Sequence, residues 1–345
     1  MTLTAIDLFC GVGGLTHGFI KESISVIAGI DADQSCKFAF EANNPGAQFL
    51  KRDVGVLSAT ELDQLFPKGA TRILAGCAPC QPFSRYTRRK SPDEKWKLVS
   101  TFADLAIASR PEIVTMENVI QLQNHAVFKR FVKRLELAGY CVTYFTARGP
   151  EYGIPQSRTR LVVFASLFGP IDIVGPTHDA SRRPNLRGAI GNLPQLKAGG
   201  VCATDSLHRC RDLSPVNLRR IQAATPGGFW HDWPEELKLR CHKKKSGHTY
   251  RSVYGRMSWD EPSPVVTTQF IGLGNGRFGH PEQDRALSLR EGALLQTFPK
   301  SYVFIDPRAK RISMHAIARQ IGNAVPVTLG RIVARSIKRH VRAFQ

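Results

Sequence analysis

The sequence has little acidic charge and lacks any long apolar run. Its 345 residues include 48 lysines and arginines but only 28 aspartates and glutamates, which gives a formal net charge of +20. Such an excess of positive charge favours a polyanionic partner such as nucleic acid. No apolar run approaches the ~20 residues that a membrane-spanning helix requires, so we expect no membrane association.

The sequence also has few closely spaced cysteines. Among its eight cysteines there is a single C-x-x-C pair, Cys77 and Cys80. One pair is weak evidence for a redox site or half of a zinc site, and the prolines around Cys80 do not resemble a redox turn. Five residues could suggest zinc, but their spacing matches no common structural zinc pattern, so we expect no metal; they are Cys202, His208, Cys210, Cys241 and His242. Without a recognisable secretory signal, the cysteines indicate reduced thiols in a cytoplasmic protein.

What the sequence does contain is a series of short apolar segments, each predicted to be a strand of an α/β sheet. Residues 5–10 lead into Gly11-Val12-Gly13-Gly14 and a short helical pattern, residues 26–30 lead into Asp31, and residues 48–50 precede Asp53. Ligands bind at the carboxyl ends of such strands. Glycines allow close backbone approach, and an acidic residue about twenty positions later can bind ribose hydroxyls. Each aspartate could instead be an ordinary helix N-cap.

The glycine turn lacks the third glycine of a dinucleotide site and the phosphate cradle of a P-loop. This absence favours a nucleoside ligand without pyrophosphate over a dinucleotide or a nucleoside triphosphate. A G-x-G-G pattern is a weak signal when it is taken alone.

A further expected strand, residues 72–76, leads to Pro79-Cys80-Gln81-Pro82-Phe83-Ser84. A cysteine beyond the carboxyl end of a strand is a candidate nucleophile, although a free cysteine is more commonly a small buried residue. Residues 113–116 deliver Glu117 and Asn118 to the same edge. A partly desolvated Glu117 could stay protonated and act as an acid, or it could be a surface residue or a cap.

Six blocks occur along the chain in the following order: Asp7–Gly14, Pro79–Ser84, Glu117–Val119, Gln156–Arg160, Arg285 with Arg290–Pro299, and Gln320–Pro326. Together they resemble the DNA (cytosine-5) methyltransferases, a family that uses S-adenosyl-L-methionine. The resemblance covers residues 5–326. It implies an α/β Rossmann-like class I methyltransferase sheet with a second, smaller, irregular target-recognition domain.

The resemblance also implies roles for individual residues. The catalytic group would be Cys80, Gln81, Glu117, Asn118, Arg158 and Arg160. The cofactor would be bound by Phe9, Gly11, Val12, Gly13, Gly14, Asp31, Ala32, Asp53, Pro79, Leu98, Asn323 and Val325. DNA would be contacted by Ser84, Arg85, Arg88, Arg89, Thr267 and Thr268.

The activity implied is methylation of cytosine C5 within a specific sequence of double-stranded DNA, through a covalent Cys80–C6 adduct with base flipping. We expect a monomer that associates with the prokaryotic nucleoid and serves as the modification enzyme of a restriction-modification system; a lone housekeeping methylase fits equally well. A cognate endonuclease would be encoded nearby and would form no stable complex with it. One alternative is a tRNA cytosine-5 methyltransferase, although the Cys-Phe-Thr signature of that branch is not evident. Another is a non-catalytic DNA-binding module, against which the intact Cys80, Glu117 and Arg160 argue.

We expect residues 1–168 to form the catalytic and cofactor-binding domain, residues 169–305 the target-recognition domain, and residues 306–345 a return to the catalytic domain. Helices are expected at 124–138 and 325–341 from their patterns. Residues 265–270 resemble a strand that the family places near the target base. The basic stretch 85–97 predicts a mobile loop that closes over the flipped base, or else a solvated surface loop.

Overall fold

The computed structural model describes residues 2–79, 92–244 and 252–344. The chain divides into two compact units. The first consists of Met1–Tyr152, Thr159–Thr177 and Ala324–Gln345, and the second consists of Gly153–Arg158 and His178–Asn323.

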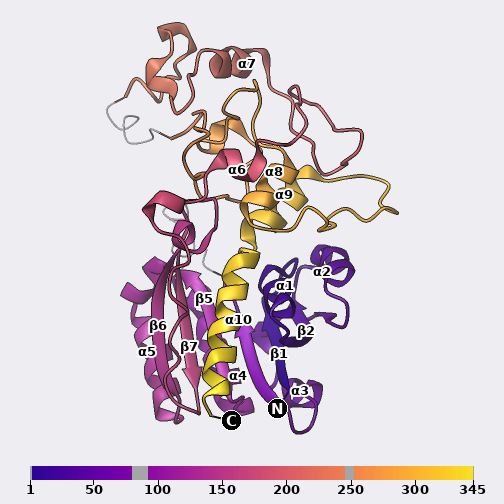
Figure 1. Ribbon diagram of the computed structural model, residues 1–345, viewed down its shortest axis with the longest axis vertical. Helices are drawn as coiled ribbons and strands as arrows, with labels where there is room; N and C mark the ends of the chain where they lie inside the picture. The colour runs from indigo at the N-terminus through magenta and orange to yellow at the C-terminus, as the bar shows by residue number, and fades with distance from the viewer. Residues whose placement is uncertain (1, 80–91, 245–251, 345) are drawn as a thin grey trace. The chain divides into compact units, whose positions relative to one another are not determined.

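A seven-stranded sheet, in the order β3-β2-β1-β4-β5-β7-β6, forms the centre of the first unit (Figure 1). Strands β3, β2, β1, β4 and β5 run parallel, whereas β7 is antiparallel to both β5 and β6. The strands are β1 Leu3–Leu8, β2 Ser25–Asp31, β3 Gln48–Lys51, β4 Thr71–Gly76, β5 Ile113–Val119, β6 Cys141–Arg148 and β7 Thr159–Ser166. Because Gly76 is in register with Leu8 and with Met116, the residues that follow β1 and β4 lie at one edge of the sheet with the last residues of β5.

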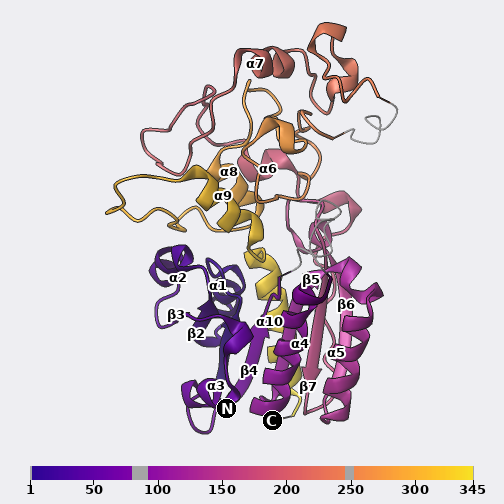
Figure 2. The same cartoon turned by 180° about the vertical axis from the view of Figure 1, so that it is seen from behind.

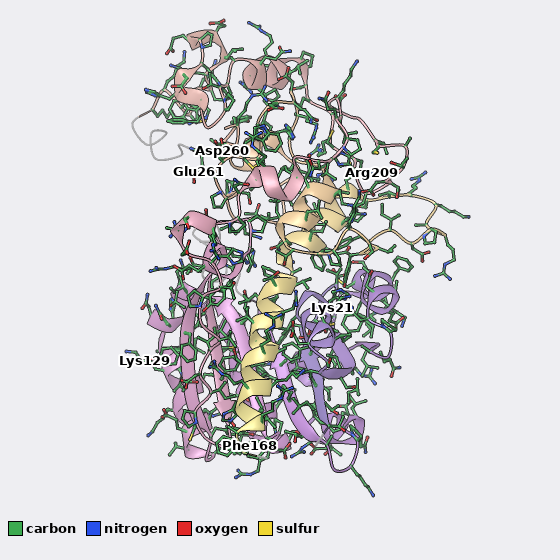
Figure 3. All side chains as sticks on the ribbon, in the orientation of Figure 1. Lys21, Lys129, Phe168, Arg209, Asp260 and Glu261 are labelled. Carbon is green, nitrogen blue, oxygen red and sulfur yellow. The ribbon has the colours of Figure 1, made fainter. Side chains whose placement is uncertain are left out.

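Helices cover both faces of this sheet. Helix α10 lies along α1 on one face (Figure 1), and α3, α4 and α5 cover the other face (Figure 2). Their bounds, with that of α2, are α1 Gly14–Lys21, α2 Lys37–Asn43, α3 Ala59–Leu65, α4 Pro92–Ser109, α5 Ala126–Leu137 and α10 Val327–Arg342. Leu62, Phe102 and Phe131 from α3, α4 and α5 join one apolar core with strand residues. On the solvent side of α5, Lys129 is exposed (Figure 3), as expected for an amphipathic helix.

The second unit is built from short helices and irregular segments. Its helices are α6 Leu186–Ile190, α7 Pro215–Gln222, α8 Leu289–Leu295 and α9 Met314–Asn323. Among the described residues of this unit, β-structure is limited to isolated bridges such as Val201 with Arg209. Its interior contains a fully buried ion pair, in which Arg285 donates from Nη1 and Nη2 to the two carboxylate oxygens of Glu291 at 2.8 and 2.7 Å. None of the helices in the described ranges is long and apolar enough to cross a membrane.

The expected α/β class with a smaller irregular second part is confirmed, and every predicted strand of the sheet is present. Strand β6 was not predicted. It is the edge strand, and Thr143 and Phe145 are half-buried while Tyr144 and Thr146 are exposed, so it lacks the continuous apolar run of the central strands. The predicted helices correspond to α5 and α10.

Two local predictions are wrong. Residues 265–270 form no strand, because the Val266 N–H donates to the Gln156 side chain at 3.2 Å and the Phe270 N–H closes a turn onto the Thr267 carbonyl. Residues 92–97 belong to α4 rather than to a loop, with Pro92 at a helix start where proline is favoured. The remainder of the predicted loop, residues 85–91, lies outside the described residues.

The second unit continues to Asn323 instead of ending at residue 305. Helix α9 explains this, because Gln296 donates to the Ile321 carbonyl at 2.7 Å. A Cβ on Gly322 would lie only 2.4 Å from the backbone of Thr267. These contacts tie α9 to the second unit, and the chain returns to the first unit at Ala324.

Candidate active site

The turn after β1 has an unusual backbone. Phe9, Gly11 and Gly13 adopt positive φ angles of 57°, 52° and 84°. A bulky residue such as Phe9 rarely adopts this conformation, so the surrounding structure must impose it. A Cβ on Gly13 would lie 2.7 Å from Asn44 Nδ2 and 2.9 Å from a carbon of Phe40, whereas a Cβ on Gly11 would meet nothing within 4 Å. The turn is therefore closely packed at Gly13 and open at Gly11.

The carboxylate of Asp31 links this turn to the end of β2. The Gly11 N–H donates to Oδ2 at 2.9 Å, and the Asp33 N–H donates to Oδ1 at 2.8 Å. Burial raises the pKa of Asp31, although these backbone hydrogen bonds oppose the shift. Ala32 is exposed beside it, Val12 is buried within the turn, and α1 begins at Gly14.

Asp53 and Leu98 are brought together beyond the end of β3. Asp53 Oδ1 accepts a hydrogen bond from the Gly55 N–H at 2.8 Å and so begins a short 3-10 turn, Val54–Val56. A Cβ on Gly55 would lie 3.1 Å from Asp53 Oδ1 and 3.5 Å from Leu98 Cδ2. Asp53 is thus the local cap that its alternative interpretation suggested, and it also lies beside an apolar residue of α4.

Glu117 is almost fully buried on β5, with 3% of its surface exposed, and is contacted from both neighbouring strands. From the end of β4, the Cys77 thiol donates to Oε2 at 2.9 Å. From β7, Arg160 Nε lies 2.9 Å from Oε1 as an ion pair. That contact lacks the alignment of a hydrogen bond, and Oε1 accepts none from the part of the chain that the structure describes.

Asn118 fixes the segment that leads to Cys80. Its Nδ2 donates to the carbonyl of Ala78 at 3.0 Å, and both residues are buried. The Cys77 N–H donates to the Leu8 carbonyl at 3.3 Å, which continues the β1–β4 pairing beyond the strand. Pro79 is exposed. The backbone is therefore held on two sides until two residues before Cys80.

Several predicted residues lie in the second unit. Arg158 is buried there, and its backbone N–H donates to the Gln156 carbonyl at 2.7 Å. Thr267 and Thr268 follow the Val266–Gln156 contact, and Asn323 is an exposed residue at the end of α9.

Of the other predicted residues, Val325 lies in the first unit and six lie outside the described ranges. Val325 is buried in the first unit, two residues along the chain from Asn323 but on the other side of the boundary. The remaining predicted residues lie outside the described ranges: Cys80, Gln81, Ser84, Arg85, Arg88 and Arg89.

His208, one of the residues considered above for zinc, has structural partners. His208 is buried, with Nδ1 2.9 Å from Ser288 Oγ and Nε2 2.8 Å from the Pro194 carbonyl. Within residues 2–79, 92–244 and 252–344, no group of three or more His, Cys, Asp or Glu side chains could hold a metal ion. Both ring nitrogens of His208 are thus accounted for by packing.

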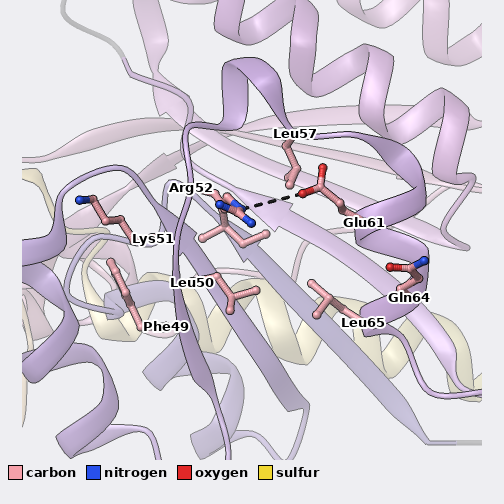
Figure 4. Close-up of a pocket in the computed structure, with 9 residues that line it drawn as sticks. Phe49, Leu50, Lys51, Arg52, Leu57, Glu61, Gln64 and Leu65 are labelled. Carbon is pink, nitrogen blue, oxygen red and sulfur yellow. Dashed lines mark ion pairs between the residues drawn. The ribbon is translucent and has the colours of Figure 1, made fainter.

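A pocket of about 310 Å³ beside strand β3 was not predicted (Figure 4). An Arg52–Glu61 ion pair with a 3.9 Å separation spans it. Its lining is Ile30, Phe49, Leu50, Lys51, Arg52, Leu57, Glu61, Gln64 and Leu65. None of these is a predicted cofactor residue, although Ile30 precedes Asp31 and Arg52 precedes Asp53.

Sequence reasoning considered Cys77 only as half of a C-x-x-C pair, and so missed its contact with Glu117. A signal for this contact exists in the strand order. Cys77 directly follows β4, Glu117 lies on the adjacent parallel strand β5, and the register pairs Gly76 with Met116. Residues 77 and 117 therefore follow a matched pair and are neighbours.

Comparison with known proteins identifies the family of the chain. The model of the family C-5 cytosine-specific DNA methylase matches residues 3–339. The Type II methylase M.HgiDII of Herpetosiphon aurantiacus is 51% identical over 347 residues, which cover 100% of this chain and 97% of the relative. The Type II methyltransferase M.Eco47II of Escherichia coli is 31% identical, with 97% and 78% covered.

Solved structures share the fold. A putative DNA modification methyltransferase encoded within an E. coli prophage superposes with a TM-score of 0.75 at 20% identity, covering 99% of this chain and 100% of the other. The S. pombe Dnmt2 methyltransferase gives a TM-score of 0.62 at 18% identity, with 99% of each chain covered. Since the family model extends over nearly the whole chain and the first relative is half identical along its length, the protein belongs to the C-5 cytosine-specific DNA methylases and is a DNA (cytosine-5)-methyltransferase.

Proposed function

We propose that the enzyme methylates one cytosine within a specific sequence of double-stranded DNA, with S-adenosyl-L-methionine as the methyl donor and Cys80 as a covalent nucleophile. The main observation in support is the buried carboxylate of Glu117. It is contacted from two strands, yet its Oε1 accepts no hydrogen bond from the described residues. A polar atom that is buried without a hydrogen-bond partner is costly, so its partner is expected to be a substrate.

The residues at the ends of β1, β2 and β3 fit the proposed cofactor. The turn has open space at Gly11, which would let a ligand approach the backbone closely. Asp31 offers carboxylate oxygens for ribose hydroxyls. Asp53 and Leu98 offer a polar and an apolar contact for a base. When bound, S-adenosyl-L-methionine supplies an electrophilic methyl group. Its binding residues would be Phe9, Gly11, Val12, Gly13, Gly14, Asp31, Ala32, Asp53, Pro79, Leu98, Asn323 and Val325.

Cys80 would make cytosine C5 nucleophilic. Its thiolate adds to C6, forming an S–C6 bond, while the electron pair of the C5–C6 double bond moves towards C5 and the ring. Glu117 hydrogen-bonds or protonates N3 and so limits the negative charge that builds in the ring. After C5 has been methylated and has lost its proton, the double bond re-forms and the thiolate leaves.

The two arginines would orient the base and the carboxylate. The ion pair with Glu117 gives Arg160 a direct part in holding the acid, and its charge also favours the thiolate form of a nearby cysteine. Arg158 is the second candidate for polar contact with the base. Gln81 and Asn118 complete the catalytic group, and Asn118 supports this role by anchoring the Ala78 carbonyl.

Contact with the duplex would come from the basic segment that follows Cys80 and from the second unit. In a duplex, C5 and C6 are stacked inside the helix, so the target base must be flipped out before Cys80 can reach it. Arg85, Arg88 and Arg89 would contact phosphates after Ser84, and Thr267 and Thr268 would contact DNA from the second unit. The net charge of +20 favours binding to the phosphate backbone.

The biological setting we propose is restriction-modification. Two relatives are named Type II methylases, a class that accompanies a restriction endonuclease. The enzyme would act as a monomer at the nucleoid and form no stable complex with its endonuclease.

The test is transfer of radiolabelled methyl groups from S-adenosyl-L-methionine to unmethylated genomic DNA and, in parallel, to bulk tRNA. We expect label in DNA as 5-methylcytosine, at least about 10³-fold reduced in Cys80→Ser. DNA carrying 5-fluorocytosine at the methylated site should trap an enzyme–DNA adduct that survives denaturation, because fluorine cannot leave as a proton does. Label only in tRNA, or full activity of Cys80→Ser, would overturn the proposal.

A further inference from the structure

We propose that Cys77 is a positioning residue for Glu117: its thiol holds Oε2 of the carboxylate and thereby reserves Oε1 for the target base. This inference rests on the proposed function, because it assigns a task to a neighbour of the proposed acid. The observation that carries it is the 2.9 Å contact from Cys77 Sγ to Glu117 Oε2 in a site where Glu117 is 3% exposed.

A carboxylate can rotate about its terminal bond, so a single contact would leave its two oxygens exchangeable. Glu117 has contacts on opposite sides, from Cys77 at the end of β4 and from Arg160 on β7. Among the described residues, these two groups are the titratable or charged ones that contact the carboxylate. The thiol occupies Oε2. Arg160 Nε lies 2.9 Å from Oε1 without the alignment of a hydrogen bond, so Oε1 keeps hydrogen-bonding capacity for a substrate.

The contact is half of a reciprocal pair. Cys77 donates from the segment after β4 to Glu117, and the next residue of β5, Asn118, donates back to Ala78 at 3.0 Å. The two bonds connect consecutive residues of two neighbouring segments. A shift of the segment that precedes Cys80 would therefore also move the carboxylate, which couples the proposed acid to the backbone leading to the proposed nucleophile.

A cysteine at this position could be only a small residue that fills space, and the choice of variants separates the two roles. Cys77→Ala keeps the small size and removes the donor, whereas Cys77→Ser keeps a donor. If the thiol positions Glu117, alanine should lower kcat about tenfold and serine should restore it to within about threefold of wild type. The KM for DNA and for the methyl donor should change less than about twofold.

A double-mutant cycle adds a readout that space-filling would not affect, because a thiol that acts through Glu117 should matter little once that carboxylate is replaced. In a Glu117→Gln background, Cys77→Ala should lower kcat less than about twofold further. An equal loss in both backgrounds, or a serine variant no better than alanine, would overturn the proposal.

A measurement without substrate tests the contact independently of DNA methylation. In a Cys80→Ser background, the negative Glu117 carboxylate should oppose formation of the Cys77 thiolate, which is the form that reacts with iodoacetamide. Replacing Glu117 by glutamine should speed alkylation of the Cys77 peptide about tenfold at pH 8, measured by mass spectrometry. Cys141, which is exposed, serves as the internal control, and its rate should not change. Equal Cys77 rates in the two proteins would show that thiol and carboxylate do not interact, whatever the outcome of the methylation assay.

Discussion

Besides Glu117, the described residues include one buried carboxyl group in each unit, Asp7 and Glu291, and the surroundings shift their pKa values in opposite directions. Asp7 on β1 of the first unit is 3% exposed, and the Thr16 hydroxyl donates to its Oδ2 at 2.7 Å. Burial raises the pKa of Asp7 to about 7, with the Thr16 bond opposing the shift. Burial likewise acts to raise the pKa of Glu291 in the second unit, but the two hydrogen bonds and the charge of Arg285 outweigh it and hold that pKa below its ordinary value.

The difference follows from how each unit fills its interior. The first unit has a sheet and a large apolar cluster that includes Ile6, Leu74 and Phe102. The burial of this cluster stabilises the unit enough to tolerate Asp7, a carboxyl group whose desolvation is only partly offset. The second unit has short helices and small apolar clusters, and it places charged groups at its centre. In such an interior, removing a single charged partner should have a greater effect than in the first unit.

The largest expected effect is therefore that of Arg285→Ala. Glu291 would stay buried and lose both guanidinium donors of Arg285, although the Ser288 N–H would still donate to Oε2 at 2.7 Å, and the lost charge pair should cost about 3–5 kcal/mol of stability. Hydrogen exchange measured by mass spectrometry should show lost protection in peptides from residues 178–323, with the strands of the first unit protected as before. Arg308, 83% exposed and paired with Asp306, is the matched control, and its replacement by alanine should cost less than about 1 kcal/mol. Equal loss of protection in both units would contradict the comparison.

The second prediction uses pH to test whether Asp7 keeps its proton in the folded state. Because the folded-state pKa of Asp7 is raised from 3.8 to about 7, the folded state retains a proton that the unfolded chain releases. Stability should therefore fall as pH rises from about 4 to about 7, by up to about 1.4 kcal/mol per pH unit, and then level off. Asp7→Asn has no proton to lose and keeps an acceptor for Thr16. Urea unfolding monitored from pH 4 to 8 should give a wild-type slope that the variant lacks, and parallel curves would refute the assignment.

The sequence predicts the first unit far better than the second, for the same physical reason. Continuous apolar runs such as residues 72–76 and 113–116 identify buried parallel strands, and the β4–β5 register places Glu117 next to the residue that follows β4. The second unit depends on contacts between distant residues, such as Gln156 with Gln296 at 2.7 Å, that no local pattern encodes. The thiol of Cys77 escaped prediction because a side-chain contact depends on strand order as well as on position.

The smallest expected effect comes from the helix crossing that supports the glycine turn. A Cβ on Gly18 of α1 would lie 2.7 Å from backbone atoms of Val327, Gly330 and Arg331 in α10. Because backbone cannot move aside as a flexible side chain does, Gly18→Ala should cost about 1–3 kcal/mol, even though alanine favours helices. Displacing α1 also displaces the turn at Gly11, so the KM for the methyl donor should rise more than the KM for DNA.

The matched control for this crossing is Gly188→Ala in α6 of the second unit. The added Cβ there would meet only Asn185 Oδ1, at an ordinary 3.5 Å, so helix propensity alone should decide the outcome and stability should rise by up to about 1 kcal/mol. Thermal unfolding and initial-rate kinetics of both variants give the comparison. If Gly18→Ala proves as benign as Gly188→Ala, then α1 and α10 can separate without cost, and the turn does not depend on the crossing for its position.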